Sequence, residues 1–437
     1  MWSQDLRSKF ALGVLALELL PMLAMLPVIL LVWILLLEVG QLAALIATAA
    51  SGPLFVVSAC SVILLFRRYA LLQTPVGVHH LRSQLGLEKW FGDKLLEVSL
   101  ELTNSLYGTL YTSRWLRLLG AKIGRNTEIA TIANIDPDLL TLEDGSFVAD
   151  MASVGPATYA NGHVAFQRTE VGRRAFVGNA SFIPSGTHLG DGSLVGVGSV
   201  PPVAGVKPGT SWLGSPSIFL PAREMYDEFT EETTFRPSRR KVVARYLIEF
   251  VRATLPASLL GLSTFGTLFV LYLLTNTVPL WAMVLLTPAL ALGFSLMTVL
   301  VVAAMKWIIV GRYRPRVEPL WSGFVRRTEF VTGIFEGTAV PVLLDVLSGT
   351  PMLAPLMRLF GVRVGRRVLL SSTYLTEFDL VRIADDVTVG PKVSLQTHLF
   401  EDRVMKMGTI ELEPEVSLGC RAVVLYGAHL GRGSHSS

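Results

Sequence analysis

Two long stretches of the chain are almost entirely apolar. The first lies between Lys9 and Arg67 and contains no lysine or arginine, and the second lies between Arg252 and Lys306 and contains no charged residue. A helix needs about 20 apolar residues to cross a bilayer, so each stretch is long enough for two spans. We therefore predict two membrane-spanning helical hairpins. Their tips are expected near residues 38–41 and 275–279.

The two polar parts of the chain have a different pattern, with an aliphatic residue at every sixth position. Glycine often follows that residue, as in Val171-Gly172 and Val177-Gly178. This hexapeptide period is typical of a left-handed parallel β-helix, in which three faces make one coil of about 18 residues. Strands of an ordinary sandwich would alternate with period two instead. The longest runs are Val171, Val177, Ile183, Leu189 and Val195 in the first part, and Leu412, Leu418, Val424 and Leu430 in the second.

The chain also repeats itself at an offset of 241 residues. "LRLLGAKIGR" (116–125) is similar to "MRLFGVRVGR" (357–366), and the same offset relates Asp138 to Asp379. We therefore predict a duplicated unit in which a helical hairpin precedes a β-helix. The second copy reaches Ser437 before a closing coil, so we expect the chain to be a piece of a longer protein or to be capped by another segment.

These patterns divide the chain into a predicted series of parts. The acidic stretch "EMYDEFTEETTF" (224–235) is interpreted as a surface helix or a linker. The parts are transmembrane hairpin 1 (1–70), a linker with an amphipathic helix (71–119), β-helix 1 (120–222), an acidic and basic linker (223–248), transmembrane hairpin 2 (249–310), a linker with an amphipathic helix (311–360) and an incomplete β-helix 2 (361–437).

Positive residues flank the apolar stretches, whereas the hairpin tips carry none. Arg67 and Arg68 follow the second span, and a basic cluster at 239–241 precedes the third. Because loops rich in lysine and arginine stay in the cytoplasm, we predict cytoplasmic termini and cytoplasmic β-helices. A signal peptide is the alternative, but the first apolar stretch far exceeds a signal core of about 7–15 residues. Glu18 lies in the predicted first span. We interpret it as a residue near a helix end or one that faces another helix, and the alternative is a functional intramembrane acid.

Composition agrees with a membrane protein that carries polar domains. The 437 residues have a mean hydropathy of +0.51, and 16% of them are charged. The net charge of +4 is too small to favour nucleic acid as a partner. Cys60 and Cys420 lie in unlike surroundings, so we expect no disulfide and a reducing compartment. Cys420 is interpreted as a packed small residue rather than as a nucleophile.

The segment "VSLQTHLFEDRV" (393–404) interrupts the period of six after Leu395 and contains the main candidate for chemistry, His398. An imidazole can take a proton from an amine or hydroxyl near neutral pH. The alternative is a loop histidine on a scaffold. At the matching position the first copy has Ala157, so that copy is either inactive or uses His163 instead.

The wider segment 397–431 resembles the active-site region of hexapeptide acetyltransferases. That resemblance implies that His398 is the general base at the start of an out-looping segment and that Arg403 belongs to the site. Glu411 is expected to orient the imidazole ring, with Glu401 or Asp402 as alternatives.

The chain as a whole resembles the C-terminal region of membrane-anchored non-ribosomal peptide synthetases of the ε-poly-lysine type. The motifs are "LWSGFVRRTEF" (320–330), "GTP" (349–351), "LFGVRVGRRV" (359–368) and "LQTHLFEDRVMKMG" (395–408). The resemblance implies a phosphopantetheine-linked thioester donor, adenylation and carrier domains as partners, and a bacterial inner membrane. This chain departs from the family: it has four spans rather than six, two β-helices rather than three, and neither an adenylation motif nor a carrier serine.

The remaining histidines are weaker candidates. His188 and His429 each precede an inward aliphatic residue, so we expect them to face outward. His79 and His80 lack further ligands at a metal-binding spacing, and we expect no metal.

Three functions remain open at this point. The chain is an acyl or aminoacyl transfer module that forms amide bonds from a carrier-bound thioester, or a membrane-anchored scaffold that docks a synthetase or carrier, or a stand-alone acetyltransferase that uses acetyl-CoA.

Overall fold

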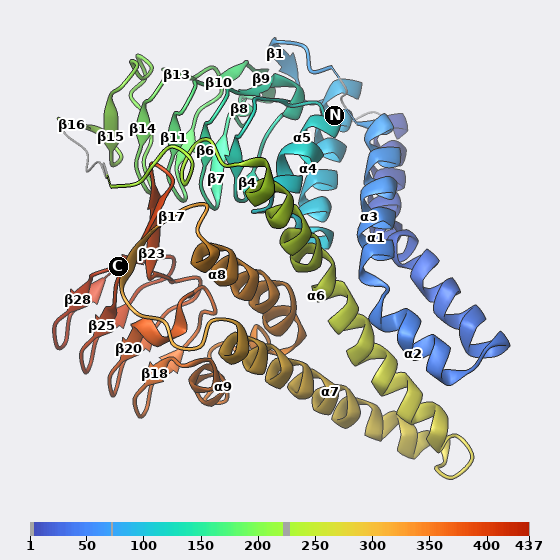
Figure 1. The fold of residues 1–437 in the computed structure, drawn as a ribbon. Helices are drawn as coiled ribbons and strands as arrows, with labels where there is room; N and C mark the ends of the chain where they lie inside the picture. The colour runs from blue at the N-terminus through green and yellow to red at the C-terminus, as the bar shows by residue number, and fades with distance from the viewer. Residues whose placement is uncertain (1–3, 71–72, 222–227, 437) are drawn as a thin grey trace. The chain divides into compact units, whose positions relative to one another are not determined.

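The structure is a computed structural model that describes residues 4–70, 73–221 and 228–436. The first four residues of the acidic stretch at 224–235 lie outside the described residues. The chain divides into two compact units, and each contains helices and a stack of parallel strands (Figure 1). Unit 1 comprises residues 1–34, 53–226 and 243–254, and unit 2 comprises residues 35–52, 227–242 and 255–437.

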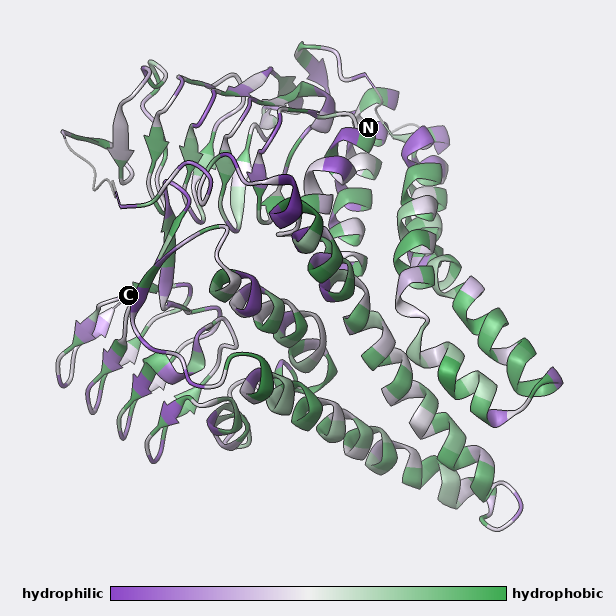
Figure 2. Ribbon diagram, in the orientation of Figure 1, coloured by the Kyte–Doolittle hydropathy of each residue, from purple (hydrophilic) through white to green (hydrophobic). Residues whose placement is uncertain are grey.

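Within the described residues, four helices are long and apolar enough to cross a membrane, and Figure 2 shows their hydrophobic residues in green. The helices α1 and α6 contain 35 and 36 residues, which corresponds to about 50 Å at a rise of about 1.5 Å per residue. A hydrocarbon core is only about 30 Å thick, so part of each helix extends beyond it. The four are α1 (Gln4–Glu38), the stretch Gly52–Tyr69, α6 (Arg239–Leu274) and α7 (Leu280–Ile309).

The second half of the first apolar stretch is a broken helix rather than the continuous span that we predicted. α2 (Gln41–Ala49) ends before Ser51, whose hydroxyl donates to the Thr48 carbonyl at 2.8 Å. α3 (Gly52–Phe66) then begins, with Pro53 in its first turn, where a missing N–H is tolerated. A short 3₁₀ turn, η1 (Arg67–Tyr69), follows it.

The polar part of unit 1 is a parallel β-helix, because successive strands along the chain enter different sheets. Its core is a column of inward aliphatic residues that includes the predicted run from Val171 to Val195. The first sheet contains β2 (Lys122–Ile123), β5 (Leu140–Leu142), β10 (Thr169–Val171) and β13 (His188–Leu189). The second contains β3 (Glu128–Ile129), β6 (Phe147–Val148), β11 (Phe176–Val177), β14 (Leu194–Val195), β15 (Ser211–Leu213) and β16 (Ile218–Leu220), and the third contains β4 (Ile132–Ala133), β7 (Ala152–Val154) and β12 (Phe182–Ile183).

Unit 2 contains a second parallel β-helix with the same order of faces. Many of its strands lie 241 residues after a strand of unit 1, as β20 does after β5 and β25 after β10. The described strands therefore repeat at the predicted offset, while an origin by duplication remains a prediction. The sheets contain β18 (Arg363–Val364), β20 (Val381–Ile383), β25 (Ile410–Leu412) and β28 (His429–Leu430), then β19 (Leu369–Leu370), β21 (Thr388–Val389), β26 (Ser417–Leu418) and β29 (His435–Ser436), and finally β22 (Ser394–Gln396) and β27 (Val423–Leu425).

The glycine that follows an inward aliphatic residue is required by close packing between coils. A Cβ on Gly124 would lie 2.4 Å from the backbone nitrogen of Asp144, which belongs to the next coil. Gly124 is not among the residues with positive φ, and the positive-φ turns are occupied by other glycines, such as Gly145 (φ 73°), and by other residue types, such as Asn126 (φ 52°) and Arg174 (φ 53°). The glycine in the hexapeptide pattern is therefore required by the short distance between neighbouring coils and not by a positive φ angle.

In each unit an antiparallel hairpin projects from the β-helix and pairs with a strand that precedes the helices of that unit. Unit 1 has β1 (Gly77–His80), β9 (His163–Phe166) and β8 (Thr158–Ala160), with α4 (Gln84–Leu102), η2 (Asn104–Leu106), α5 (Leu110–Leu118) and η3 (Pro137–Leu139). Unit 2 has β17 (Arg316–Pro319), β24 (Val404–Met407) and β23 (His398–Glu401), with α8 (Gly323–Ile334), the π-helix η4 (Phe335–Leu344), α9 (Leu353–Phe360) and η5 (Phe378–Leu380).

Helix α6 begins ten residues earlier than the span that we predicted from residue 249. Residues 243–254 of α6 belong to unit 1, where the guanidinium of Arg245 donates to both carboxylate oxygens of Glu128 at 2.7 and 2.8 Å. The same guanidinium donates to Glu249 at 2.6 Å, and Glu249 also accepts the backbone N–H of Leu110 at 2.7 Å. This buried network fixes the start of α6 against β3 and α5.

Candidate functional site

His398 lies at the base of the hairpin that β23 and β24 form in unit 2. It is paired in register with Met407, and its side chain is 24% exposed. Its ring packs edge-on against Phe400, with centroids 5.5 Å apart. The segment that we expected to loop out of the β-helix is therefore an ordered hairpin, and His398 stands where it leaves the coil.

The carboxylate beside the ring belongs to Glu377, 21 residues earlier on the preceding coil. Glu377 is fully buried and has a φ of 39°, a conformation that costs free energy for a residue with a Cβ. The residue after it, Phe378, packs its ring against Phe335 and Phe360 at centroid distances of 4.8 and 5.1 Å. This aromatic cluster holds the turn from which Glu377 reaches the imidazole.

One oxygen of Glu377, Oε2, receives three polar contacts. The Nδ1 atom of His398 lies 2.7 Å away, and the hydroxyls of Thr376 and Thr397 each donate at 2.7 Å. Thr397 is itself buried and lies 2.9 Å from the carbonyl of Thr376. The other oxygen, Oε1, is buried and has no hydrogen-bond partner among the described residues.

The surroundings of Glu377 keep it ionised at neutral pH. Burial by itself raises the pKa of this carboxyl, but the facing His398 and the hydrogen bonds from His398, Thr397 and Thr376 lower the pKa below its ordinary value on balance. A carboxylate that accepts a hydrogen bond from Nδ1 directs the proton to that nitrogen and stabilises the ring when it becomes positive. The arrangement can therefore support an imidazole that takes a proton at Nε2.

Glu411, which we predicted to orient the ring, makes other contacts. It stands on the outward side of β25, between the buried Ile410 and Leu412. Its carboxylate accepts from Arg382 at 2.5 Å and lies 3.5 Å from Nδ1 of His429. Strand alternation turns Glu411 outward, and the carboxylate that contacts the His398 ring is that of Glu377. The alternative Glu401 pairs with Lys406 at 2.9 Å.

Arg403 lies at the tip of the hairpin that carries His398 at its base. It is 1% exposed and has a φ of 62°, next to Asp402 with a φ of 46°. Its guanidinium stands over the ring of Phe235 at 5.0 Å, and its carbonyl accepts the N–H of Leu320 at 2.8 Å. These contacts place Arg403 in the packing of the tip.

Unit 1 has no imidazole at the corresponding position. The offset of 241 assigns Asp136 to the place of Glu377 and Ala157 to the place of His398. Ala157 packs against an apolar cluster that contains Val164 and Phe166. Asp136 is buried and accepts from the ammonium group of Lys89 at 2.7 Å.

The ammonium of Lys89 is shared by two carboxylates, because Asp93 also lies 2.6 Å away. Burial tends to lower the pKa of Lys89, but Asp136 and Asp93 raise it on balance. For Asp136 the effect of burial is larger than the effect of Lys89, and burial raises the pKa of this carboxyl. Because two carboxylates face one ammonium, Lys89 is charged at neutral pH.

The other histidines lie in different surroundings. Nδ1 of His163 lies 2.9 Å from the Asn161 carbonyl, and its ring lies 4.1 Å from that of His80. His188 and His429 are exposed, as predicted for outward residues. Cys420 is exposed as well, so its interpretation as a packed residue was wrong. Within residues 4–70, 73–221 and 228–436, no three metal-ligating side chains come together.

Sequence reasoning missed Glu377 and its two threonines. A signal was present, because "IDPDL" (135–139) and "TEFDL" (376–380) share the offset of 241 and both carry an acid at their second position. We had matched only the later acids, Asp138 and Asp379. The acid that two repeats share at a buried turn would have pointed to the partner of His398.

No protein-family model matches the chain. The delta-poly-L-ornithine synthetase of Acinetobacter baumannii (strain AB307-0294) is 35% identical to it over 366 residues, which are 83% of this chain. That match confirms the predicted resemblance to a synthetase of an amino-acid homopolymer. The chain spans only 27% of the length of that relative.

Among the solved structures that match the chain are acetyltransferases, all with TM-scores well below 0.5. Soybean serine acetyltransferase has a TM-score of 0.22 and 15% identity, over 39% of this chain and 57% of its own. A maltose O-acetyltransferase from Clostridium difficile 630 has a TM-score of 0.19 and 16% identity, over 30% and 76%. At these scores the β-helix is assigned from the strand pairing above, not from the matches.

Proposed function

We propose that this chain is a membrane-bound aminoacyl transfer module that forms amide bonds from a thioester carried on a pantetheine arm. The observation that carries the proposal is the 2.7 Å contact between Nδ1 of His398 and the buried Glu377. A histidine oriented by a buried carboxylate is suited to remove a proton from an attacking amine. The similarity to a poly-ornithine synthetase supports an amide as the product.

The proposed step balances as an aminolysis of a thioester. Nε2 of His398 accepts a proton from the amine nitrogen while that nitrogen attacks the thioester carbonyl. The new C–N bond forms, the C–S bond breaks, and the proton returns to the departing thiolate. Glu377 stabilises the positive ring during the step without taking the proton itself.

The membrane parts give the proposal its setting. Four helices that can cross a membrane and the basic residues beside them favour β-helices on the cytoplasmic side of a bacterial inner membrane. Adenylation and carrier domains, in the same natural chain or as partners, would load the donor. A third β-helix, left-handed as we predict for the two in this chain, would complete the set of three that the ε-poly-lysine type of synthetase contains. Of the two copies of the unit, the second would then carry the base His398, and the first has Ala157 at the corresponding position.

The proposal is tested by aminolysis with the purified chain in lipid nanodiscs. The donor is an aminoacyl thioester of N-acetylcysteamine, the acceptor is an amino-acid amine, and the readouts are thiol release and amide product by mass spectrometry. We expect His398→Ala to lower the rate by about 10²–10⁴-fold, the usual contribution of a positioned base. His163→Ala, in the corresponding hairpin of unit 1, is the matched control and should react at the wild-type rate.

Three outcomes would contradict the assignment. An inserted His398→Ala variant with the full rate would remove His398 from the mechanism. Wild-type turnover with acetyl-CoA alone would favour the stand-alone acetyltransferase, and no turnover with any donor would favour a docking scaffold.

A further inference from the structure

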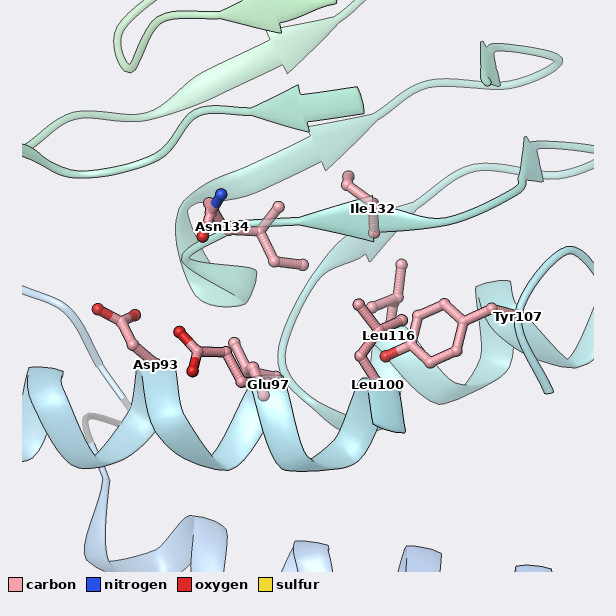
Figure 3. Close-up of a pocket in the computed structure, with 9 residues that line it drawn as sticks. Asp93, Glu97, Leu100, Tyr107, Leu116, Ile132 and Asn134 are labelled. Atoms are coloured by element: carbon pink, nitrogen blue, oxygen red, sulfur yellow. The ribbon is translucent and has the colours of Figure 1, made fainter. Parts of the chain in front are cut away.

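Unit 1 contains a pocket beside the turn that corresponds to the His398 site of unit 2 (Figure 3). α4 forms one wall, and the segment from Ile132 to Ile135 forms the facing wall. The cavity has a volume of about 60 Å³. A single water needs roughly 10–15 Å³, so the pocket has room for a short chain of several atoms.

The two ends of the pocket differ in character. Asp93 and Glu97 lie one turn apart on α4, and Figure 3 shows both carboxylates directed toward the side that carries Asn134. Toward the other end lie Leu100 and Ile132, with further apolar lining from Leu116 and the ring of Tyr107. A cavity with an acidic mouth and an apolar interior matches a group that has a positive head and an aliphatic stem.

The corresponding positions of unit 2 lack this combination. β1 and β17 are 239 residues apart, as are the starts of α4 and α8, and that offset assigns Thr332 to the place of Asp93. The offset of 241 within the β-helices assigns Leu375, which is buried, to the place of Asn134. The offset of 239 assigns Glu336 to the place of Glu97, so unit 2 keeps one of the two acids. The combination of Asp93, Glu97 and Asn134 therefore belongs to unit 1, which has no imidazole at the position of His398.

We propose that this pocket of unit 1 binds a primary alkylammonium group, with the ammonium between Asp93, Glu97 and the amide oxygen of Asn134 and the alkyl stem against Leu100 and Ile132. An ammonium has three donors, which fits three facing oxygens. The identification of this group with the amine substrate rests on the proposed function. Unit 1 would then hold an ammonium end of the substrate that does not itself react.

The present partners of the two acids leave room for a ligand. Glu97 pairs with Lys94 at 2.5 Å, and both side chains are about half exposed, so that pair contributes little and can exchange. Asp93 is tied more firmly, because it also accepts from Lys89 at 2.6 Å and from the hydroxyl of Tyr159 at 3.1 Å. Glu97 is therefore the residue to vary.

The test uses the full chain in detergent micelles and n-butylammonium as the probe, with binding measured by calorimetry against empty micelles. Butan-1-ol has the same stem without the charge and should bind at least tenfold more weakly. Glu97→Gln should weaken butylammonium binding about tenfold, and Glu97→Lys should abolish it. Glu101→Gln, one turn further along α4 and exposed, is the matched control and should bind like the wild type.

Equal binding of butylammonium and butanol, or unchanged binding by Glu97→Gln, would overturn the proposal. Absence of binding to the wild type would do the same. His398→Ala should retain butylammonium binding, because His398 lies in unit 2. A chain that binds the amine but forms no amide would therefore contradict the proposed function and leave this site intact, and the reverse result would remove this site alone.

Discussion

The two units use one buried acid at the same turn in opposite ways. In unit 2, Glu377 receives an imidazole and two threonine hydroxyls on one oxygen. In unit 1, Asp136 receives the ammonium of Lys89. An imidazole can gain and lose a proton near neutral pH, whereas a lysine beside two carboxylates stays charged. The first pair can therefore take part in proton transfer, while the second is a fixed ion pair.

The residues around each acid changed together. The offset of 239 assigns Thr328 to the place of Lys89, and Thr328 is 1% exposed. The offset of 241 assigns Ile135 and Pro156 to the places of Thr376 and Thr397. Where lysine is present, the imidazole and both hydroxyls are absent. A buried carboxylate has to be compensated, and each unit contains one complete way of doing so.

The largest effect on stability is expected from removing that compensation in unit 1. Lys89→Met leaves Asp136 buried without its partner, which should lower the free energy of unfolding by about 3–5 kcal/mol. Urea unfolding followed by tryptophan fluorescence in micelles measures the change. Lys94→Met, which removes an exposed partner on the same helix, is the control and should have little effect.

The double variant Lys89→Met with Asp136→Asn sharpens this comparison. It removes both charges, so most of the lost stability should return. A single Lys89→Met variant as stable as the wild type would show that the ion pair is not what holds unit 1 together.

A smaller effect is expected from Glu377→Gln, which retains the size of the side chain and removes its charge. The rate should fall by about 10–100-fold, because the ring loses the group that stabilises its positive form. The loss of that carboxylate should also move the acidic limb of the pH–rate profile to lower pH. A purely structural role predicts a lower rate with an unmoved profile, so the position of the limb decides between the two.

The smallest effect is expected from Glu411→Gln. Glu411 contacts Arg382 and His429 on the outside of β25, so the rate should stay within about twofold of the wild type. Steady-state thiol release measures it beside Glu377→Gln. A large loss for Glu411 and none for Glu377 would restore our original prediction and reject the geometry of the site.

The regular parts of the fold could be predicted from sequence because they repeat. Inward aliphatic residues at every sixth position, such as Val177 and Leu418, are buried as expected. The break at Ser51 was missed, because an apolar composition predicts insertion in the membrane but says little about where a helix ends inside the stretch.

The candidate site could be predicted only in part, for a geometric reason. The period of six is interrupted after Leu395, and His398 lies in the segment that interrupts it, so this residue could be found from one continuous stretch of sequence. Its partner Glu377 stands 21 residues away, and one coil of the β-helix brings the two together. Sequence proximity favoured Glu411 instead, although that strand position faces outward. A residue that contacts His398 from the adjacent coil lies about one coil length away in the sequence, so it has to be sought at that separation and not among the nearest residues.

The hairpin beside His398 also has a consequence for how such proteins can vary. Inward residues Leu395 and Leu412 are 17 positions apart, which is not a multiple of six, so the hairpin absorbs the difference. An insertion within a coil would shift every later side chain to the wrong face. An insertion at the tip, near Asp402, leaves the coils in register. Changes of loop length at this hairpin can therefore occur next to the reacting groups without moving the aliphatic core of the coils.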